Sequence, residues 1–246
     1  MKLFGLIGYP LGHSFSKEYF TEKFRKEGLT DCRFESFAIP SIEAFESLIE
    51  KNPSLMGLGV TIPYKEQVLQ FIDELSDEVK AIGATNSIKI CNGKLTAYNT
   101  DITGFEESFV KMLQPHQNRA LILGTGGASK AVQYVFKKLG IEFLMVTRTS
   151  NEKDNHIIYQ QLDEKIMSDY SIVVNCSPVG MYPNNDQAPD IPYQFLSPRH
   201  YLYDLVYKPE KTLFLQKGEA AGAIIQNGYE MLLIQAEASW EIWNSA

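Results

Sequence analysis

The stretch VTIPYK, residues 60–65, brings a hydroxyl, a proline and a lysine together at the end of a short apolar run. A lysine side chain is an ammonium at neutral pH, so it can donate a proton or stabilise a developing negative charge. Pro63 fixes the local backbone and therefore the direction in which Lys65 is presented. The alternative is a surface lysine that opens the next helix, but a cation there faces the unfavourable end of the helix dipole. The pattern favours a chemical role for Lys65 and leaves the alternative open.

A second stretch that suggests chemistry is GTGGAS, residues 124–129. It lies between an apolar run and an amphipathic segment within 119–150, as a dinucleotide-binding βαβ unit requires. Gly124 would make the tight turn, and Gly126 would let the backbone approach a pyrophosphate at the helix N-terminus. Ser129 replaces the third glycine of the usual pattern, where a small residue suffices. An ordinary glycine-rich turn is the alternative, and the two flanking elements favour the cofactor site.

The residues that end the following strand indicate which cofactor binds. The sequence there reads VTRTSN, with hydroxyls at Thr147 and Thr149, a guanidinium at Arg148 and no carboxylate before Glu152. A site for NAD usually carries Asp or Glu at this place, whereas a site for NADP carries a cation for the 2′-phosphate. The sequence therefore predicts NADP, with a solvated surface arginine as the alternative for Arg148.

Short apolar runs alternate with amphipathic segments along the chain, which is typical of parallel strands joined by crossover helices. The sequence predicts an α/β protein in which a first α/β unit is followed by the βαβ unit and a parallel sheet. A hairpin is expected around Asn92-Gly93. The other predicted strands are 2–8, 32–39, 57–60, 170–178, 201–207 and 222–228, and the predicted helices include 15–28, 41–52, 64–75 and 229–244. The crossover over 150–169 is polar and short.

Composition limits the classes of function. The chain has 246 residues, 44% of them hydrophobic and 22% charged, with a formal net charge of −7. This size allows one large domain or two small ones, and the negative charge makes nucleic acid an unfavourable partner. No apolar run reaches the length of a membrane span and the start does not read as a signal peptide, so we expect a cytoplasmic protein. The three cysteines are far apart, and we expect them to act as small hydrophobic side chains, with no disulfide and no metal site.

Taken together, the motifs resemble one family. GYPLGHSFS, GVTIPYK, GATNSI, NTD, GTGGAS, TRT, NCSPVGM and NGYEMLLIQA occur in the order and nearly at the spacing found in shikimate dehydrogenases, NADP-dependent enzymes of aromatic amino-acid biosynthesis. The resemblance implies a substrate domain of residues 1–101 plus 230–246, a Rossmann domain of residues 102–229 and an active cleft where they meet. It implies reduction of 3-dehydroshikimate to shikimate with NADPH, by a monomer or homodimer that binds a small-molecule substrate.

The resemblance also implies roles for individual residues. Lys65 would be the catalytic residue beside Asp101, and would exchange the hydroxyl proton that nicotinamide cannot carry. The substrate carboxylate would be bound by Ser14, Ser16, Thr61 and Tyr207, and the ring hydroxyls by Asn86, Asp101 and Gln235. The cofactor would contact Gly124, Thr125, Gly126, Gly127 and Ala128 at the pyrophosphate, Thr147, Arg148 and Thr149 at the 2′-phosphate, and Leu205 and Gly228 at the nicotinamide. Ser14 and Asp101 have helix caps as their alternatives, and Gln235 has a solvent-facing position.

Some positions depart from the family pattern. Gly59 stands where the family usually has Asn, and Lys17 stands where it commonly has Pro. The trimmed crossover lacks a second phosphate-binding arginine and leaves Lys153 as the only nearby cation. These departures keep two other readings open, an NAD-dependent quinate/shikimate dehydrogenase and a dinucleotide-sensing binding protein with little turnover.

Overall fold

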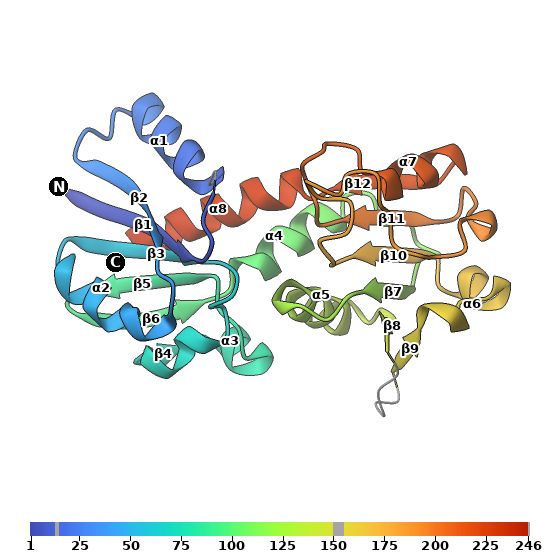
Figure 1. The fold of residues 1–246 in the computed structure, drawn as a ribbon, viewed down its shortest axis with the longest axis horizontal. Coiled ribbons are helices and arrows are strands. Elements are labelled where there is room, and N and C mark those ends of the chain that lie inside the picture. Colours follow the sequence, from blue (N-terminus) through green and yellow to red (C-terminus); the bar gives the residue numbers. More distant parts are fainter. Residues whose placement is uncertain (13–14, 150–154, 246) are drawn as a thin grey trace. The chain divides into compact units, whose positions relative to one another are not determined.

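The computed structural model describes residues 1–12, 15–149 and 155–245 and consists of two compact units (Figure 1). Unit 1 comprises Met1–Thr100 together with Gln235–Ala246, and unit 2 comprises Asp101–Ile234. Each unit contains one six-stranded sheet. The α/β class predicted from the sequence is therefore confirmed.

The sheet of unit 1 is mixed, with the strand order β2-β1-β3-β5-β6-β4. Strand β1 pairs in parallel with both β2 and β3, whereas β5 runs antiparallel to β3 and β6. The predicted hairpin joins β5 and β6 through Asn92 and Gly93, both at positive φ, as a tight two-residue turn requires. The strands are β1 (Lys2–Gly8), β2 (Cys32–Ala38), β3 (Leu55–Val60), β4 (Glu74–Leu75), β5 (Ser87–Cys91) and β6 (Lys94–Tyr98).

Helices cover both faces of this sheet. On one face, α1 (Phe15–Glu27) and the last helix, α8 (Tyr229–Asn244), build an aromatic cluster with the sheet. Phe4 of β1 lies 5.6 Å from the Trp243 ring and 5.0 Å from the Trp240 ring, centroid to centroid. Burying an aromatic side chain of this size contributes roughly 1.5–3 kcal/mol, so the cluster fixes the end of the chain on unit 1. The other helices of unit 1 are α2 (Phe45–Lys51) and α3 (Asp77–Ile82).

Two predicted helices of unit 1 differ from the structure. The helix predicted over 64–75 is wrong, because only a 3₁₀ helix forms over Gln67–Phe71, and Glu74–Leu75 becomes β4, parallel to β6. Asp73 exchanges backbone and side-chain hydrogen bonds with Leu95, so pairing at the sheet edge overrides the helical pattern. The helix predicted from Ser41 begins as a 3₁₀ turn over Ile42–Ala44, and the Ser41 side chain makes no cap hydrogen bond.

Unit 2 is a doubly wound unit whose sheet is parallel throughout, in the order β12-β11-β10-β7-β8-β9. Counted from β7, this is the 6-5-4-1-2-3 order of dinucleotide-binding sheets, which reverses direction between β7 and β10. The strands are β7 (Arg119–Leu123), β8 (Glu142–Thr147), β9 (His156–Ile158), β10 (Ile172–Asn175), β11 (Tyr201–Asp204) and β12 (Ile224–Asn227). The short edge strand β9 was missed from the sequence, because three residues give too little pattern.

The helices of unit 2 pack on both faces of its sheet. α4 (Thr100–Phe109) and α5 (Gly127–Leu139) meet in a fully buried aromatic group that includes Phe105, Phe109 and Phe136. The other face packs against α6 (Glu164–Asp169) and α7 (Leu213–Ala220) through a cluster that contains Leu121, Val146 and Val173. No helix within the described ranges combines the length and the apolar character needed to cross a bilayer.

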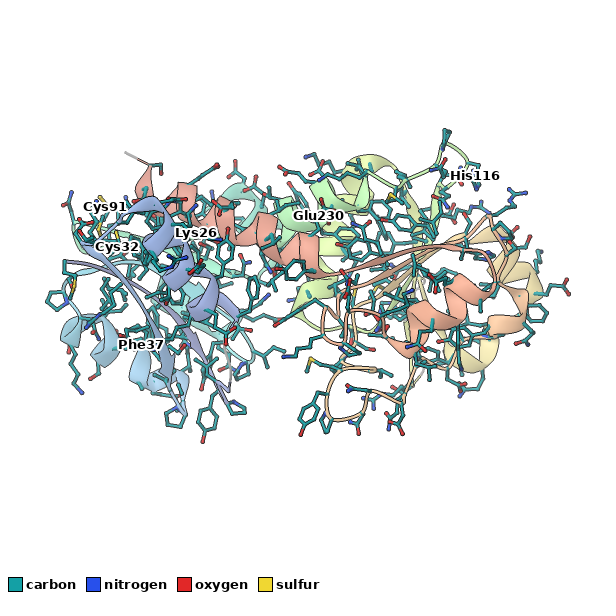
Figure 2. All side chains as sticks on the ribbon, turned by 90° about the horizontal axis from the view of Figure 1, so that it is seen from above. Lys26, Cys32, Phe37, Cys91, His116 and Glu230 are labelled. Atoms are coloured by element: carbon teal, nitrogen blue, oxygen red, sulfur yellow. The ribbon has the colours of Figure 1, made fainter. Side chains whose placement is uncertain are left out.

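The three cysteines carry free thiols, and two of them, Cys32 and Cys91, are labelled in Figure 2. Cys91 is exposed and the other two are half-buried. They form no disulfide with one another, and Cys91 lies next to the exposed hairpin turn.

Candidate active site

The backbone on both sides of Lys65 is held by hydrogen bonds. The Thr61 N–H donates to the Ile7 carbonyl at 3.0 Å, the Tyr64 N–H donates to the Thr61 carbonyl at 2.9 Å, and the Thr85 N–H donates to the Lys65 carbonyl at 2.8 Å. Tyr64 is only 2% exposed, and its hydroxyl donates to the Ile39 carbonyl at 2.6 Å. Lys65 itself is half-buried. Lys65 precedes a 3₁₀ helix and does not open an α-helix, so no unfavourable helix dipole acts on it. The hydrogen-bonded turn around Lys65 is what holds it in place.

Asn86 and Gln235 lie 149 positions apart in the sequence and meet in unit 1. The Asn86 Nδ2 donates to the Gln235 Oε1 at 3.2 Å and to the Thr100 Oγ1 at 3.0 Å. On its other side the Asn86 Oδ1 accepts from the Thr100 N–H at 2.7 Å, and the Thr100 hydroxyl lies 3.0 Å from the Ser239 hydroxyl. Because the backbone N–H of Thr100 fixes the Asn86 amide, the Gln235 carbonyl oxygen must face Asn86 and its NH₂ group must point away. Gln235 is half-buried, and its Oε1 is bonded within unit 1.

Asp101 is buried, with 3% exposure, in the first turn of α4. Since α4 begins at Thr100 and the Asn86 side chain accepts the Thr100 N–H, Asn86 satisfies the start of this helix. Asp101 lies inside the helix, so the reading of it as only a helix cap is wrong. Ser16 is half-buried in the first turn of α1, and Ser14 lies outside the described residues.

Gly59 lies on β3 opposite Ser87 of β5, two residues before Thr61. A Cβ atom at this position would lie 3.0 Å from the Leu6 Cδ1 and 3.9 Å from the Asn86 carbonyl oxygen. The obstacle is the end of a flexible, half-buried side chain, so a Cβ atom would fit after a small shift of Leu6. The position therefore borders the Asn86 network.

In unit 2 the glycine turn has the backbone that a pyrophosphate site needs. Gly124 has φ +102°, and a Cβ atom on it would lie 3.3 Å from the Ser177 backbone N. Gly126 has an extended backbone and is the N-cap of α5, whose first residues are Gly127 and Ala128. Thr125 and Gly126, which precede the helix, are exposed. Ser129 is fully buried and its hydroxyl donates to the Gly126 carbonyl at 2.7 Å, which explains why a small residue serves in place of glycine. The turn therefore presents helix N–H groups to an anion.

The three residues predicted to contact the 2′-phosphate are not equivalent. The Thr147 hydroxyl donates to the Thr149 carbonyl at 2.7 Å and lies 3.3 Å from the Ile157 carbonyl, so its only hydrogen is committed within the protein. Arg148 and Thr149 are exposed. Of the three predicted phosphate contacts, Arg148 and Thr149 therefore present exposed side chains and Thr147 does not. Lys153, the other cation considered from the sequence, lies outside the described residues.

Tyr159 is a neighbour of Arg148 that sequence reasoning missed. In the register of β8 and β9, Thr147 pairs with Ile158, so the next residues, Arg148 and Tyr159, follow side by side. Burial raises the pKa of Tyr159 to about 12, against an opposing effect of the positive charge of Arg148. The signal that would have revealed this neighbour is β9 itself, which was not predicted.

The predicted nicotinamide positions lie on turns after β11 and β12. The Leu205 N–H donates to the Asn175 carbonyl at 3.0 Å, and the Gly228 N–H donates to the Val206 carbonyl at 3.4 Å. A Cβ atom on Gly228 would lie 2.2 Å from the Leu205 carbonyl oxygen, so only glycine fits there. Tyr207, a predicted substrate residue, is half-buried just beyond this turn. These turns and Gly124 share the carboxyl edge of the parallel sheet, where doubly wound sheets bind their ligands.

A group of buried polar side chains at this edge was also missed. Asn175 ends β10 and Asp204 ends β11, and the Asn175 Nδ2 donates to the Asp204 Oδ1 at 2.9 Å. Ser177, in the predicted NCSPVGM motif, donates through its hydroxyl to the Asn175 Oδ1 at 2.6 Å. The sequence signal was a polar residue at the end of each of two buried strands. Among the described residues, no three or more His, Cys, Asp or Glu side chains gather as a metal site would require.

These features are those of a nucleotide-dependent oxidoreductase built from two units. One unit is a doubly wound sheet with a glycine turn at its switch point and an Arg at the end of the second strand. The other is an α/β unit that carries an anchored lysine. Comparison with known proteins narrows this class. Residues 6–88 match the family described as shikimate dehydrogenase substrate binding domain.

Relatives match over nearly the whole chain. The shikimate dehydrogenase (NADP(+)) of Desulforamulus reducens is 33% identical over 97% of this chain and 88% of its own length, and that of Carboxydothermus hydrogenoformans is 35% identical over 98% and 91%. The shikimate 5-dehydrogenase of Thermus thermophilus, solved with NADP(H) and shikimate, superposes with a TM-score of 0.87 at 28% identity, covering 99% of this chain and 93% of its own. The chain belongs to the shikimate dehydrogenase family.

Proposed function

We propose that this protein catalyses the reversible reduction of 3-dehydroshikimate to shikimate with NADPH, a step in aromatic amino-acid biosynthesis. The observation that carries the proposal is the network in which Asn86 joins Gln235 and Thr100 in unit 1. It holds an oriented carboxamide donor within unit 1, and this suits a ring that carries several hydroxyls. The relatives named shikimate dehydrogenase (NADP(+)) support the same reaction.

NADPH, when bound, supplies the hydride. Lys65 donates a proton to the oxygen of the substrate carbonyl during reduction and takes it back during oxidation. Its ammonium also stabilises the negative charge that develops on that oxygen. We propose that Asp101 orients Lys65 and contacts a ring hydroxyl. The anchored turn from Thr61 to Lys65 limits the directions available to the lysine, so little reorganisation precedes proton transfer.

The remaining residues bind and orient. We propose that the Gln235 NH₂ group, directed by Asn86, donates to a ring hydroxyl, and that Asn86 itself reaches the ring by exchanging one of its present partners. Ser14, Ser16, Thr61 and Tyr207 are proposed to bind the substrate carboxylate.

On the cofactor side, we propose that the glycine turn binds the pyrophosphate, that Arg148 and Thr149 bind the 2′-phosphate, and that Leu205 and Gly228 contact the nicotinamide. We propose Met1–Asp101 with Glu230–Ala246 as the substrate domain and the intervening residues as the cofactor domain. The free thiols are compatible with a reducing compartment, and we propose a cytoplasmic enzyme, monomeric or homodimeric.

Steady-state absorbance at the nicotinamide band tests the proposal, with shikimate and quinate each paired with NADP⁺ and with NAD⁺. The highest kcat/KM is expected for shikimate with NADP⁺. Faster turnover of quinate with NAD⁺ would replace the proposal with the quinate/shikimate dehydrogenase alternative. Cofactor binding without turnover of either substrate would favour a dinucleotide-sensing protein.

A further inference from the structure

Asp204 is a fully buried carboxylate at the end of β11 for which the proposed reaction has no use. Three donors surround it: the Asn175 Nδ2 at 2.9 Å, the Val206 N–H at 3.0 Å and the Thr212 hydroxyl at 2.5 Å. These donors are all neutral, and burial raises the pKa of Asp204 to about 6 although the hydrogen bonds oppose that effect. A buried carboxyl group without a cation is costly for folding, so its presence calls for a reason beyond stability.

Asp204 and the Ser177 backbone N–H together determine which way the Asn175 amide faces. An ionised carboxylate accepts hydrogen bonds only, so the NH₂ end of Asn175 must point to Asp204. The carbonyl end then accepts both the Ser177 N–H at 3.0 Å and the Ser177 hydroxyl at 2.6 Å. The Asn175 Nδ2 also lies 3.3 Å from the Val179 carbonyl, and the Val179 N–H lies 3.4 Å from the Ser177 hydroxyl. One carboxylate therefore fixes the turn that follows β10.

The same carboxylate reaches the other turns of this sheet edge. Its bond to the Val206 N–H holds the turn after β11, whose Val206 carbonyl in turn accepts the Gly228 N–H at 3.4 Å. Its bond to Thr212 holds the residue that caps α7. The turn after β10 also comes close to the glycine turn, because a Cβ atom on Gly124 would lie 3.3 Å from both the Cβ and the backbone N of Ser177. The turns after β7, β10, β11 and β12 thus form one connected set within unit 2.

We propose that Asp204 is the positioning residue of the nicotinamide half of the cofactor site, holding the turns after β10 and β11 in the arrangement that receives the nicotinamide riboside. The inference rests on the proposed function, since it assumes that the cofactor binds along this edge. The adenosine half of the site, at Arg148 and Thr149, is outside the Asp204 network, so the two halves of the cofactor should respond differently to a change at Asp204.

The test uses Asp204→Ala and Asp204→Asn, with Phe136→Leu as a control that loosens the core of unit 2 beside Phe143, near the start of β8 and so at the opposite end of the sheet. The affinities of NADP⁺ and of adenosine 2′,5′-bisphosphate, which lacks the nicotinamide, are measured by calorimetry, and kcat and KM by absorbance. Asp204→Ala should weaken NADP⁺ about tenfold or more, because buried donors lose their acceptor, and leave the bisphosphate nearly unchanged. Its kcat should fall roughly 100-fold, as expected for a reacting group misplaced by about 1 Å.

Asp204→Asn keeps an acceptor for Asn175 and Val206 and should lie closer to wild type than Asp204→Ala in every measurement. The proposal would be overturned if Asp204→Ala weakened the binding of NADP⁺ and of the bisphosphate equally, or did not weaken the binding of NADP⁺. It would also be overturned if Asp204→Asn and Asp204→Ala had equal effects on affinity and kcat. If Asp204→Ala does not fold, Ser177→Ala decides by the same comparison of the two ligands. If the wild-type protein does not turn over shikimate with NADP⁺, it is the proposed function that fails.

Discussion

Replacing Arg148 by alanine tests how the protein tells NADP⁺ from NAD⁺. Arg148 follows β8 directly and is exposed, while the neighbouring Thr147 commits its hydroxyl hydrogen to backbone carbonyls. The guanidinium is therefore the main charged donor described at this end of the strand. The two cofactors differ only in the 2′-phosphate, so Arg148→Ala should weaken NADP⁺ and leave NAD⁺ nearly unchanged.

The expected size of the loss follows from the exposure of Arg148. A hydrogen bond to a charged group contributes about 1.5–3 kcal/mol, or about 10- to 150-fold in affinity. Because the side chain is exposed, solvent and salt screen its charge, and we expect the lower end, about tenfold. Raising the salt concentration should reduce the NADP⁺ preference of the wild type more than that of the variant.

Titration of both cofactors into wild type, Arg148→Ala and Thr147→Val provides the measurement. Thr147→Val is the matched control, because its lost hydroxyl bonds lie within the protein and should change both affinities alike. Equal losses of NADP⁺ and NAD⁺ in Arg148→Ala would refute the reasoning and make Arg148 a structural residue. A selective loss of NADP⁺ in Thr147→Val would instead return that threonine to the phosphate site.

Other predictions address the substrate side and the buried carboxylate. Lys65→Ala should lower kcat about 100- to 10,000-fold with a smaller change in KM. The control is Lys94→Ala, which removes a lysine of the hairpin that is paired with Glu74 of β4, and it should leave kcat unchanged in the same assay. Gly59→Asn should lower the KM for shikimate about 2- to 10-fold by adding one hydrogen bond, and a raised KM would mean that Leu6 does not yield. Asp204, whose pKa is raised from 3.8 to about 6, retains a proton in the folded state that the unfolded chain releases, so its contribution to stability falls as pH rises from about 4 to about 7. Urea unfolding across this range should show wild type losing about 2 kcal/mol relative to Asp204→Asn, and a constant difference would contradict the shift.

Much of the fold could be predicted because local patterns and tertiary structure agree. Asn92-Gly93 specifies a tight hairpin by its backbone preferences, and the glycine turn follows a buried strand and opens a helix, as predicted. The last helix was predicted over 229–244 and forms there. The failures lie where tertiary pairing decides, as at Glu74–Leu75, which joins β6 at the sheet edge instead of continuing a helix.

The sequence predicted which residues belong to the candidate site. It did not predict the hydrogen bonds between them. The Asn86 to Gln235 bond joins the hairpin to the end of the chain, and no local pattern reports a contact across 149 positions. The committed hydroxyl of Thr147 depends on β9, which is too short to read from the sequence. Asp204 was read as part of an apolar strand, so its interaction with Asn175 went unnoticed.

The two units prepare their sites by the same means. In unit 1 the Asn86 Oδ1 accepts a backbone N–H from Thr100, and in unit 2 the Asn175 Oδ1 accepts a backbone N–H from Ser177. A backbone N–H can only donate, so each carboxamide has one allowed orientation, in which its NH₂ group faces Gln235 in the first case and Asp204 in the second. Polar groups that are oriented before the ligand arrives need not lose rotational freedom on binding, so we expect affinity and rate to depend on Asn86 and Asn175.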